Sequence, residues 1–93
     1  MSRVPLSDEE TRVIFAGKAA ENFGLLDADD QRAVIKKLLS IVESSASPTS
    51  FVYERIENLD IIAVGSQGRL YTRIVESIPS EDSQYHVIFL FYI

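Results

Sequence analysis

The chain has 93 residues, 46% of them hydrophobic, so we expect a single domain over residues 1–93 with one core. It contains no cysteine, which excludes a disulfide framework and a thiolate metal site, and we expect neither a metal nor a cofactor. No segment reaches the roughly 20 apolar residues of a membrane helix and the first residues lack an apolar signal region, so we expect a cytoplasmic protein without a membrane partner.

The first predicted element is a helix over about residues 8–23. The stretch Ser7-Asp8-Glu9-Glu10 has the form of a capping box, in which the serine hydroxyl accepts from a backbone N–H and the last glutamate reaches back to the cap. Gly24 stands where a residue in the left-handed conformation commonly ends a helix. The apolar positions, spaced by three and four residues, are Val13, Ala16, Ala20 and Phe23.

The second predicted helix covers about residues 27–44. Asp27 begins it, and Asp29 and Asp30 in its first turn suit the positive end of the helix dipole. We therefore expect the acidic residues at both helix starts to serve as caps rather than as a magnesium or acid–base site. A wide apolar stripe, typical of a helix that packs on a sheet, consists of Val34, Ile35, Leu38, Leu39, Ile41 and Val42.

After a predicted linker, SSASPTS, the apolar period changes to two and predicts strands at about 51–57, 60–65, 69–77 and 85–92. Turn residues at Asn58 and in Ser66-Gln67-Gly68 imply antiparallel neighbours. The predicted fold is α+β, with two N-terminal helices packed on a mainly antiparallel four-stranded sheet. Residues 3–6 are a candidate for a short extra N-terminal strand, which Pro5 disfavours.

The last predicted strand, HVIFLFYI, is apolar on both faces. Such a strand either lies in the centre of a sheet, covered on both sides, or contributes to a dimer interface. An uncovered edge of this character would aggregate. We therefore expect a homo-oligomer or a complex with a small protein partner.

Few residues carry obvious chemistry. His86 is the only histidine, and we interpret it as an ordinary strand residue rather than as a general base. Gly65 and Gly68 lie in a predicted hairpin turn with no helix after it, so they do not form a phosphate-binding loop.

The candidate site is a row on the third predicted strand, where Arg69, Tyr71 and Arg73 share one face of the sheet. Arginine offers a planar donor fork for phosphate or carboxylate, and tyrosine offers a ring and a hydroxyl. Under the alternative interpretation, the arginines at 55, 69 and 73 form cross-strand pairs with Glu54, Glu57 or Glu76 on a solvated face.

Two helices followed by IIAVGSQGRLYTRIVE and a strongly apolar strand resemble the RelE/ParE toxin superfamily of toxin–antitoxin operons. The resemblance covers about residues 27–92, and the residues that match the glycine-turned hairpin and the next strand are Val64, Gly65, Arg69, Leu70, Tyr71, Ile88, Phe89 and Leu90. It implies a RelE-like fold. In the RelE branch, an arginine at the place of Arg69 binds the messenger backbone and stabilises charge while a 2′-hydroxyl attacks the adjacent phosphate.

Toxins of this superfamily are usually basic, whereas this chain has a formal net charge of −5, which disfavours binding to RNA or the ribosome. We therefore expect a non-catalytic RelE/ParE-like protein that works through protein contacts or self-association. The alternatives are a metal-independent messenger endoribonuclease that inhibits translation and a small regulatory module for an anionic ligand. Three lysines against fourteen acidic residues also suit a protein that works in high salt.

Overall fold

Five strands and two α-helices form in the part of the chain that this computed structural model describes, residues 10–81 and 83–93. The α+β class predicted from the sequence is confirmed. In chain order the elements are β1 (Glu10–Phe15), α1 (Gly17–Leu25), α2 (Ala28–Glu43), the 3-10 helix η2 (Pro48–Phe51), β2 (Glu54–Ile56), β3 (Leu59–Val64), β4 (Gly68–Ser80) and β5 (Ser83–Tyr92).

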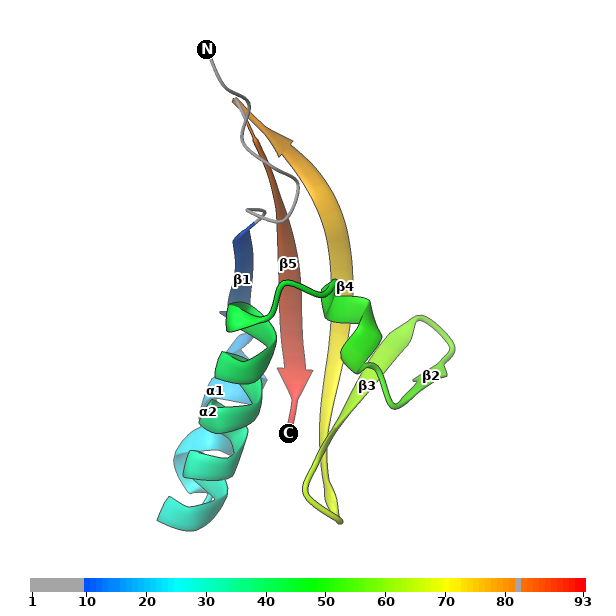
Figure 1. The fold of residues 1–93 in the computed structure, drawn as a ribbon. Helices are drawn as coiled ribbons and strands as arrows, with labels where there is room; N and C mark the ends of the chain where they lie inside the picture. Colours follow the sequence, from blue (N-terminus) through cyan, green and yellow to red (C-terminus); the bar gives the residue numbers. More distant parts are fainter. Residues whose placement is uncertain (1–9, 82) are drawn as a thin grey trace.

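The sheet has the strand order β1-β5-β4-β3-β2 (Figure 1). Strands β2 to β5 form an antiparallel meander, as the short turns predicted, and β1 pairs with β5 in parallel. The sheet is therefore five-stranded and mixed. The prediction of four antiparallel strands was incomplete because it left out β1.

The predicted helix over residues 8–23 was wrong for its first half, where residues 10–15 form β1. Thr11 and Val13 are β-branched and, with Phe15, face the helices, while Arg12 and Ile14 face the other side and are exposed. This alternation favours a strand, whereas the spacing of three and four residues along the same stretch favours a helix. Pairing with β5 stabilises the strand. Residues 3–6 and most of the expected capping box lie outside the described residues.

The first helix begins later in the chain than predicted, because residues 10–15 form β1. Helix α1 starts only at Gly17 and continues through Gly24 to Leu25, so the predicted glycine stop at 24 was wrong. Helix α2 begins where predicted, because the Oδ1 atom of Asp27 accepts a hydrogen bond from the N–H of Asp30 at 2.9 Å.

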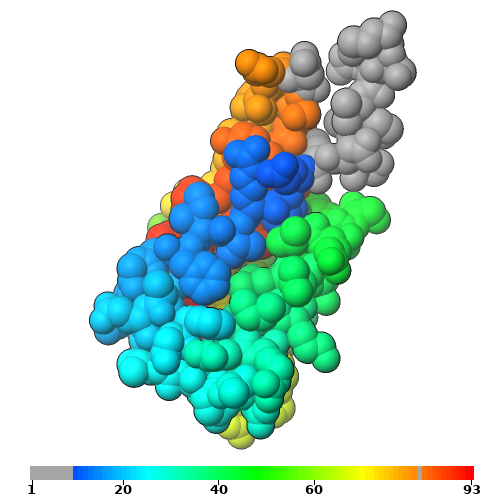
Figure 2. All heavy atoms as spheres, turned by 90° about the vertical axis from the view of Figure 1, so that its left-hand side faces the viewer, coloured from blue at the N-terminus to red at the C-terminus, as the bar shows by residue number. Residues whose placement is uncertain are grey.

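Both helices pack on one face of the sheet (Figures 1 and 2), and their side chains share one core with alternate residues of β3, β4 and β5. Strand β5 lies in the interior of the sheet between β1 and β4, which accounts for the apolar composition that also suggested a dimer interface. The fully or nearly fully buried core consists of Ala19, Val34, Leu38, Ile41, Ile62, Leu70, Ile88 and Leu90.

The connections differ in detail from the predicted ones. The predicted strand at 51–57 shortens to β2, since the buried Pro48 begins a 3-10 helix that runs to Phe51. In the turn between β2 and β3 the residue with positive φ is Glu57, at 56°, and not Asn58. In the next turn Gly65 has a φ of 64°.

A membrane span is a separate question from the fold class. None of the helices in residues 10–81 and 83–93 combines the length and the apolar character needed to cross a bilayer.

Candidate functional site

Strand β4 places the three predicted site residues on the face of the sheet that points away from α1 and α2, which we call the open face. Leu70 and Thr72 are buried on the helix side, whereas Arg69 and Tyr71 are partly buried and Arg73 is exposed. The alternation that the sequence predicted along this strand is therefore present.

The guanidinium group of Arg69 contacts neighbouring residues, but no carboxylate of the described residues neutralises its charge. Its Nη1 atom donates to the carbonyl oxygen of Gly68 at 2.8 Å, and its central carbon lies 4.6 Å from the ring centroid of Tyr53. Within residues 10–81 and 83–93 it makes no salt bridge. The predicted cross-strand pairing with Glu54, Glu57 or Glu76 is thus not formed there, and the remaining N–H groups can bind an anion.

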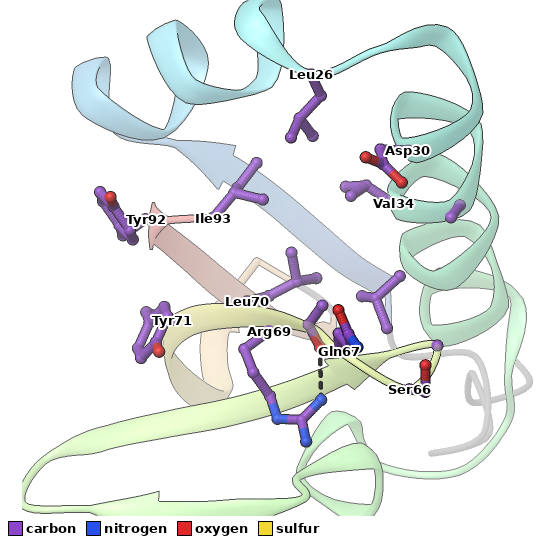
Figure 3. A pocket seen from close by; sticks show the side chains of 14 residues that line it. Leu26, Asp30, Val34, Ser66, Gln67, Arg69, Leu70, Tyr71, Tyr92 and Ile93 are labelled. Atoms are coloured by element: carbon purple, nitrogen blue, oxygen red, sulfur yellow. Dashed lines mark hydrogen bonds between the residues drawn. The ribbon is translucent and has the colours of Figure 1, made fainter.

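A cavity of about 640 Å³ lies between the start of α2 and the β3–β4 hairpin (Figure 3). Leu26, Val34 and Leu70 contribute apolar surface to its wall, and Asp30 lies near the α2 end. Figure 3 shows the guanidinium group of Arg69 turned away from these apolar side chains, to the other side of β4, which is the open face. The volume falls in the range of sites for small ligands.

Tyr71 and Tyr92 close one end of this cavity. Their ring centroids are 5.9 Å apart with an interplanar angle of 64°, an edge-to-face pair (Figure 3). The two residues are partners in the β4–β5 register, 21 positions apart in the chain. Sequence reasoning missed Tyr92 because this pairing depends on the register of β4 and β5, which is irregular at this point.

Arg73 belongs to a different depression, of about 270 Å³, that it shares with Arg55 and Asp60. Asp60 is only 3% exposed, and its Oδ1 atom accepts from Nε of Arg55 at 2.7 Å and lies 2.6 Å from Nη2 of the same ion pair. Its Oδ2 atom accepts from the N–H of Ile74 at 2.9 Å. The predicted row is therefore divided: Arg69 and Tyr71 share the larger cavity, and Arg73 does not line it.

The acidic residues at the start of α2 have separate roles. Asp27 caps the helix, Asp29 pairs with Arg32 at 2.5 Å, and Asp30 lines the large cavity. The expected capping function explains Asp27. No group of three His, Asp or Glu side chains suited to a metal ion occurs in the described part of the chain.

His86 lies away from the cavity, on the helix side of β5. It is buried, and its Nδ1 atom accepts a hydrogen bond from the N–H of Ser77 at 3.0 Å. Ser77 has a φ of 58° and belongs to an irregularity in the β4–β5 ladder, so the imidazole satisfies a backbone donor that the bulge releases.

Glu76, beside this bulge, connects η2 to β4 through side-chain hydrogen bonds. Hydrogen bonds from the Ser47 hydroxyl, and from the N–H and hydroxyl of Thr49, stabilise its carboxylate and lower the pKa of Glu76, with a smaller contribution from the charge of His86. Burial opposes this shift without reversing it. Glu76 is thus engaged in structure and does not pair with an arginine of the predicted row.

Comparison of the chain with protein-family models, with curated proteins and with solved structures finds no match. The geometry of the site combines an arginine with no salt bridge within the described residues, a pair of tyrosine rings and a cavity lined by both apolar and polar groups.

Proposed function

We propose that this chain is a RelE/ParE-like protein that acts by binding, through protein contacts and self-association, and not by catalysis. Two helices precede the antiparallel meander, and the hairpin with Gly65, Arg69 and Tyr71 is formed by β3 and β4. The apolar strand of the resemblance is β5, next to that hairpin. These features support a RelE-like fold as part of the proposal.

The observation that carries the proposal is the composition of the large cavity. It offers Arg69 as a cation and Tyr71 and Tyr92 as rings, but the imidazole of His86 is not among its lining residues. Its lining includes one carboxylate, Asp30 of α2, whereas the guanidinium group of Arg69 points to the open face of the hairpin (Figure 3). Attack of a 2′-hydroxyl on a phosphate is accelerated by a base and an acid in reach of the reacting atoms, so this composition favours binding over cleavage.

Exposed apolar side chains on several elements support contacts with a protein or with a second copy. Large hydrophobic residues that remain exposed in the described part of the chain are Ile14, Leu25, Ile35, Leu39, Val42, Tyr53, Ile56, Val75, Phe91 and Tyr92.

Cell-free translation with purified protein over a range of salt concentrations tests the proposal. We expect neither inhibition of translation nor cleavage of the messenger, and no difference between the wild type and Arg69→Ala. Arg32→Ala, which removes an exposed arginine of α2, is the matched control. Messenger cleavage that disappears in Arg69→Ala and persists in Arg32→Ala would replace the proposal with a toxin-type endoribonuclease.

The second candidate function is binding of a nucleotide or another anion at the cavity. It is favoured by one specific observation: Arg69 has no carboxylate partner among the described residues, and it lies on the same face of β4 as Tyr71, which pairs with Tyr92 at the end of the cavity. Fluorescence anisotropy with a short single-stranded RNA, and with inorganic phosphate as competitor, measures this binding. Under this candidate Arg69→Ala and Tyr71→Ala weaken binding, whereas Arg73→Ala, outside the cavity, does so much less.

A further inference from the structure

Helix α2 carries two apolar stripes, and the sheet buries only one of them. Val34, Leu38 and Ile41 form the buried stripe. The second stripe follows one residue later at every position, and its side chains are exposed to 41% at Ile35, 49% at Leu39 and 38% at Val42. In Figure 2, atoms of α1 and α2 lie at the surface of the molecule next to those of β1.

The exposed stripe has the spacing of a coiled-coil seam. Ile35, Leu39 and Val42 are separated by four and three residues, the alternation of d and a positions in a heptad. Helix α2 has 16 residues and is thus about 24 Å long, enough for two heptads. A neighbouring helix can therefore pack along the seam without any change in the core.

The charges beside this seam indicate which helix fits. Lys36 and Glu43 each follow a d residue directly, so both occupy the e position, one heptad apart. Both are exposed, and neither forms a salt bridge within residues 10–81 and 83–93. In an antiparallel pair of identical helices e faces e, so Lys36 of each copy meets Glu43 of the other. In a parallel pair each e position faces a g position. The g positions of this chain are Leu38, within α2, and Ser45, after its end, and neither side chain carries a charge.

We propose that the exposed stripe of α2 binds α2 of a second copy of this chain, antiparallel, around a two-fold axis near Leu39 and Val42. Leu39 of one copy packs against Val42 of the other, and two Lys36–Glu43 pairs flank the seam. The inference rests on the self-association in the proposed function and assigns a surface to it.

The interface is small. One helix pair buries less than the roughly 800 Å² per partner of a standard protein interface, so the dimer dissociates on the order of micromolar concentrations. The two ion pairs select orientation and partner, because exposed pairs add little affinity.

Sedimentation equilibrium across the micromolar range tests the inference with charge-reversed variants. Lys36→Glu and Glu43→Lys each place like charges opposite one another and weaken the dimer, by about fivefold or more. The double variant Lys36→Glu/Glu43→Lys restores the pairs with the charges exchanged, and its dissociation constant returns to within about twofold of the wild type. Lys18→Glu, at an exposed position of α1, is the matched control and leaves the dimer unchanged.

A second variant tests the apolar seam. Leu39→Asp abolishes the dimer at low and at high salt, and since Leu39 is exposed, circular dichroism shows a folded protein. A dimer that survives Leu39→Asp, or a double variant that stays as weak as the single ones, overturns the α2 interface but leaves self-association in place. A wild-type monomer at every concentration overturns both the interface and the self-association, while the translation assay still tests the absence of catalysis independently.

Discussion

Glu57 occupies the first position of the two-residue turn that joins β2 to β3, between the paired residues Ile56 and Leu59. Its φ of 56° places a side chain with a Cβ atom in the left-handed region, which costs roughly 1 kcal/mol. Glu57→Gly removes this cost, although a flexible glycine also gains entropy in the unfolded chain. We expect the free energy of unfolding to rise by about 0.5 kcal/mol, measured by urea denaturation.

Asn58 provides the control for this change. It is the adjacent residue of the same turn, and its φ is not positive. Asn58→Gly therefore brings only the entropic cost of glycine and is expected to lower stability slightly. Equal effects at the two positions would show that the left-handed conformation at Glu57 carries no strain.

The carboxylate of Glu76 makes stability depend on pH. Its pKa is lowered in the folded protein, first by the hydrogen bond from Ser47, from the ordinary value of 4.5. A group with a lowered folded pKa stabilises the protein above its unfolded pKa, and this stabilisation disappears as the pH falls through the folded pKa. We expect the wild type to lose stability below about pH 5 more steeply than Glu76→Gln, as measured by urea unfolding at several pH values.

Glu21→Gln is a matched control for this measurement, since Glu21 is an exposed residue of α1. Its pH dependence should follow that of the wild type. If Glu76→Gln also follows the wild type, the hydrogen bonds from η2 do not stabilise the carboxylate.

At the scale of elements, Asp60 ties three strands together. It lies on β3, accepts from Arg55 of β2 and accepts from the N–H of Ile74 of β4. Strand β2 has only three residues and lies at the edge of the sheet, where the Arg55–Asp60 pair adds to its backbone pairing with β3. Asp60→Ala removes the partner of Arg55, leaves the partly buried N–H of Ile74 without its acceptor and is expected to cost about 3 kcal/mol.

Hydrogen exchange separates the two contacts of Asp60. In Asp60→Ala the N–H of Ile74 loses its acceptor and exchanges faster, whereas in Arg55→Ala it stays protected. Arg55 is largely exposed, so its removal also costs much less stability. Similar losses in the two variants would mean that the ion pair, and not the backbone contact, is the main stabilising interaction.

Sequence patterns did not predict β1 or its pairing with β5. Residues 10–15 fit a strand by their β-branched side chains and fit a helix by the spacing of Val13 with later apolar residues. Local propensity does not separate these two, because the deciding hydrogen bonds go to residues 85–90, far along the chain. The start of α2, by contrast, depends on Asp27 and a donor three residues away, and was predictable.

At the scale of the whole molecule, the net charge of −5 disfavours the compact state through self-repulsion. Added salt shortens the Debye length from about 10 Å at 0.1 M to about 3 Å at 1 M and screens this repulsion. We therefore expect the melting temperature to rise between these two concentrations of potassium chloride, as measured by circular dichroism.

A variant with less surplus charge is the control. Glu21→Gln with Glu54→Gln removes two exposed carboxylates and brings the net charge from −5 to −3. Its gain in melting temperature with salt should be smaller than that of the wild type. An identical gain would assign the effect to strengthened burial of apolar surface instead of to charge.

The candidate site was predictable in part. Alternation along one strand placed Arg69, Tyr71 and Arg73 on one face, because the side-chain period of a strand is a local property. That Arg69 lies over Tyr53, that Tyr71 meets Tyr92, and that Arg73 lies outside the larger cavity all depend on contacts between strands. The residue pattern of the third predicted strand alone therefore does not predict these contacts.

The sequence by itself determined the α+β class, the second helix with its cap and the antiparallel order of the last strands, since each of these follows from residues within a few positions of one another. Only the tertiary structure decided that residues 10–15 form a strand, which arginines share a cavity, and which apolar stripe of α2 remains exposed. The physical reason is the same in all three cases. Segments that are far apart in the chain compete for places in one core, and this competition determines strand register and burial. The sequence of a single segment therefore does not predict either of them.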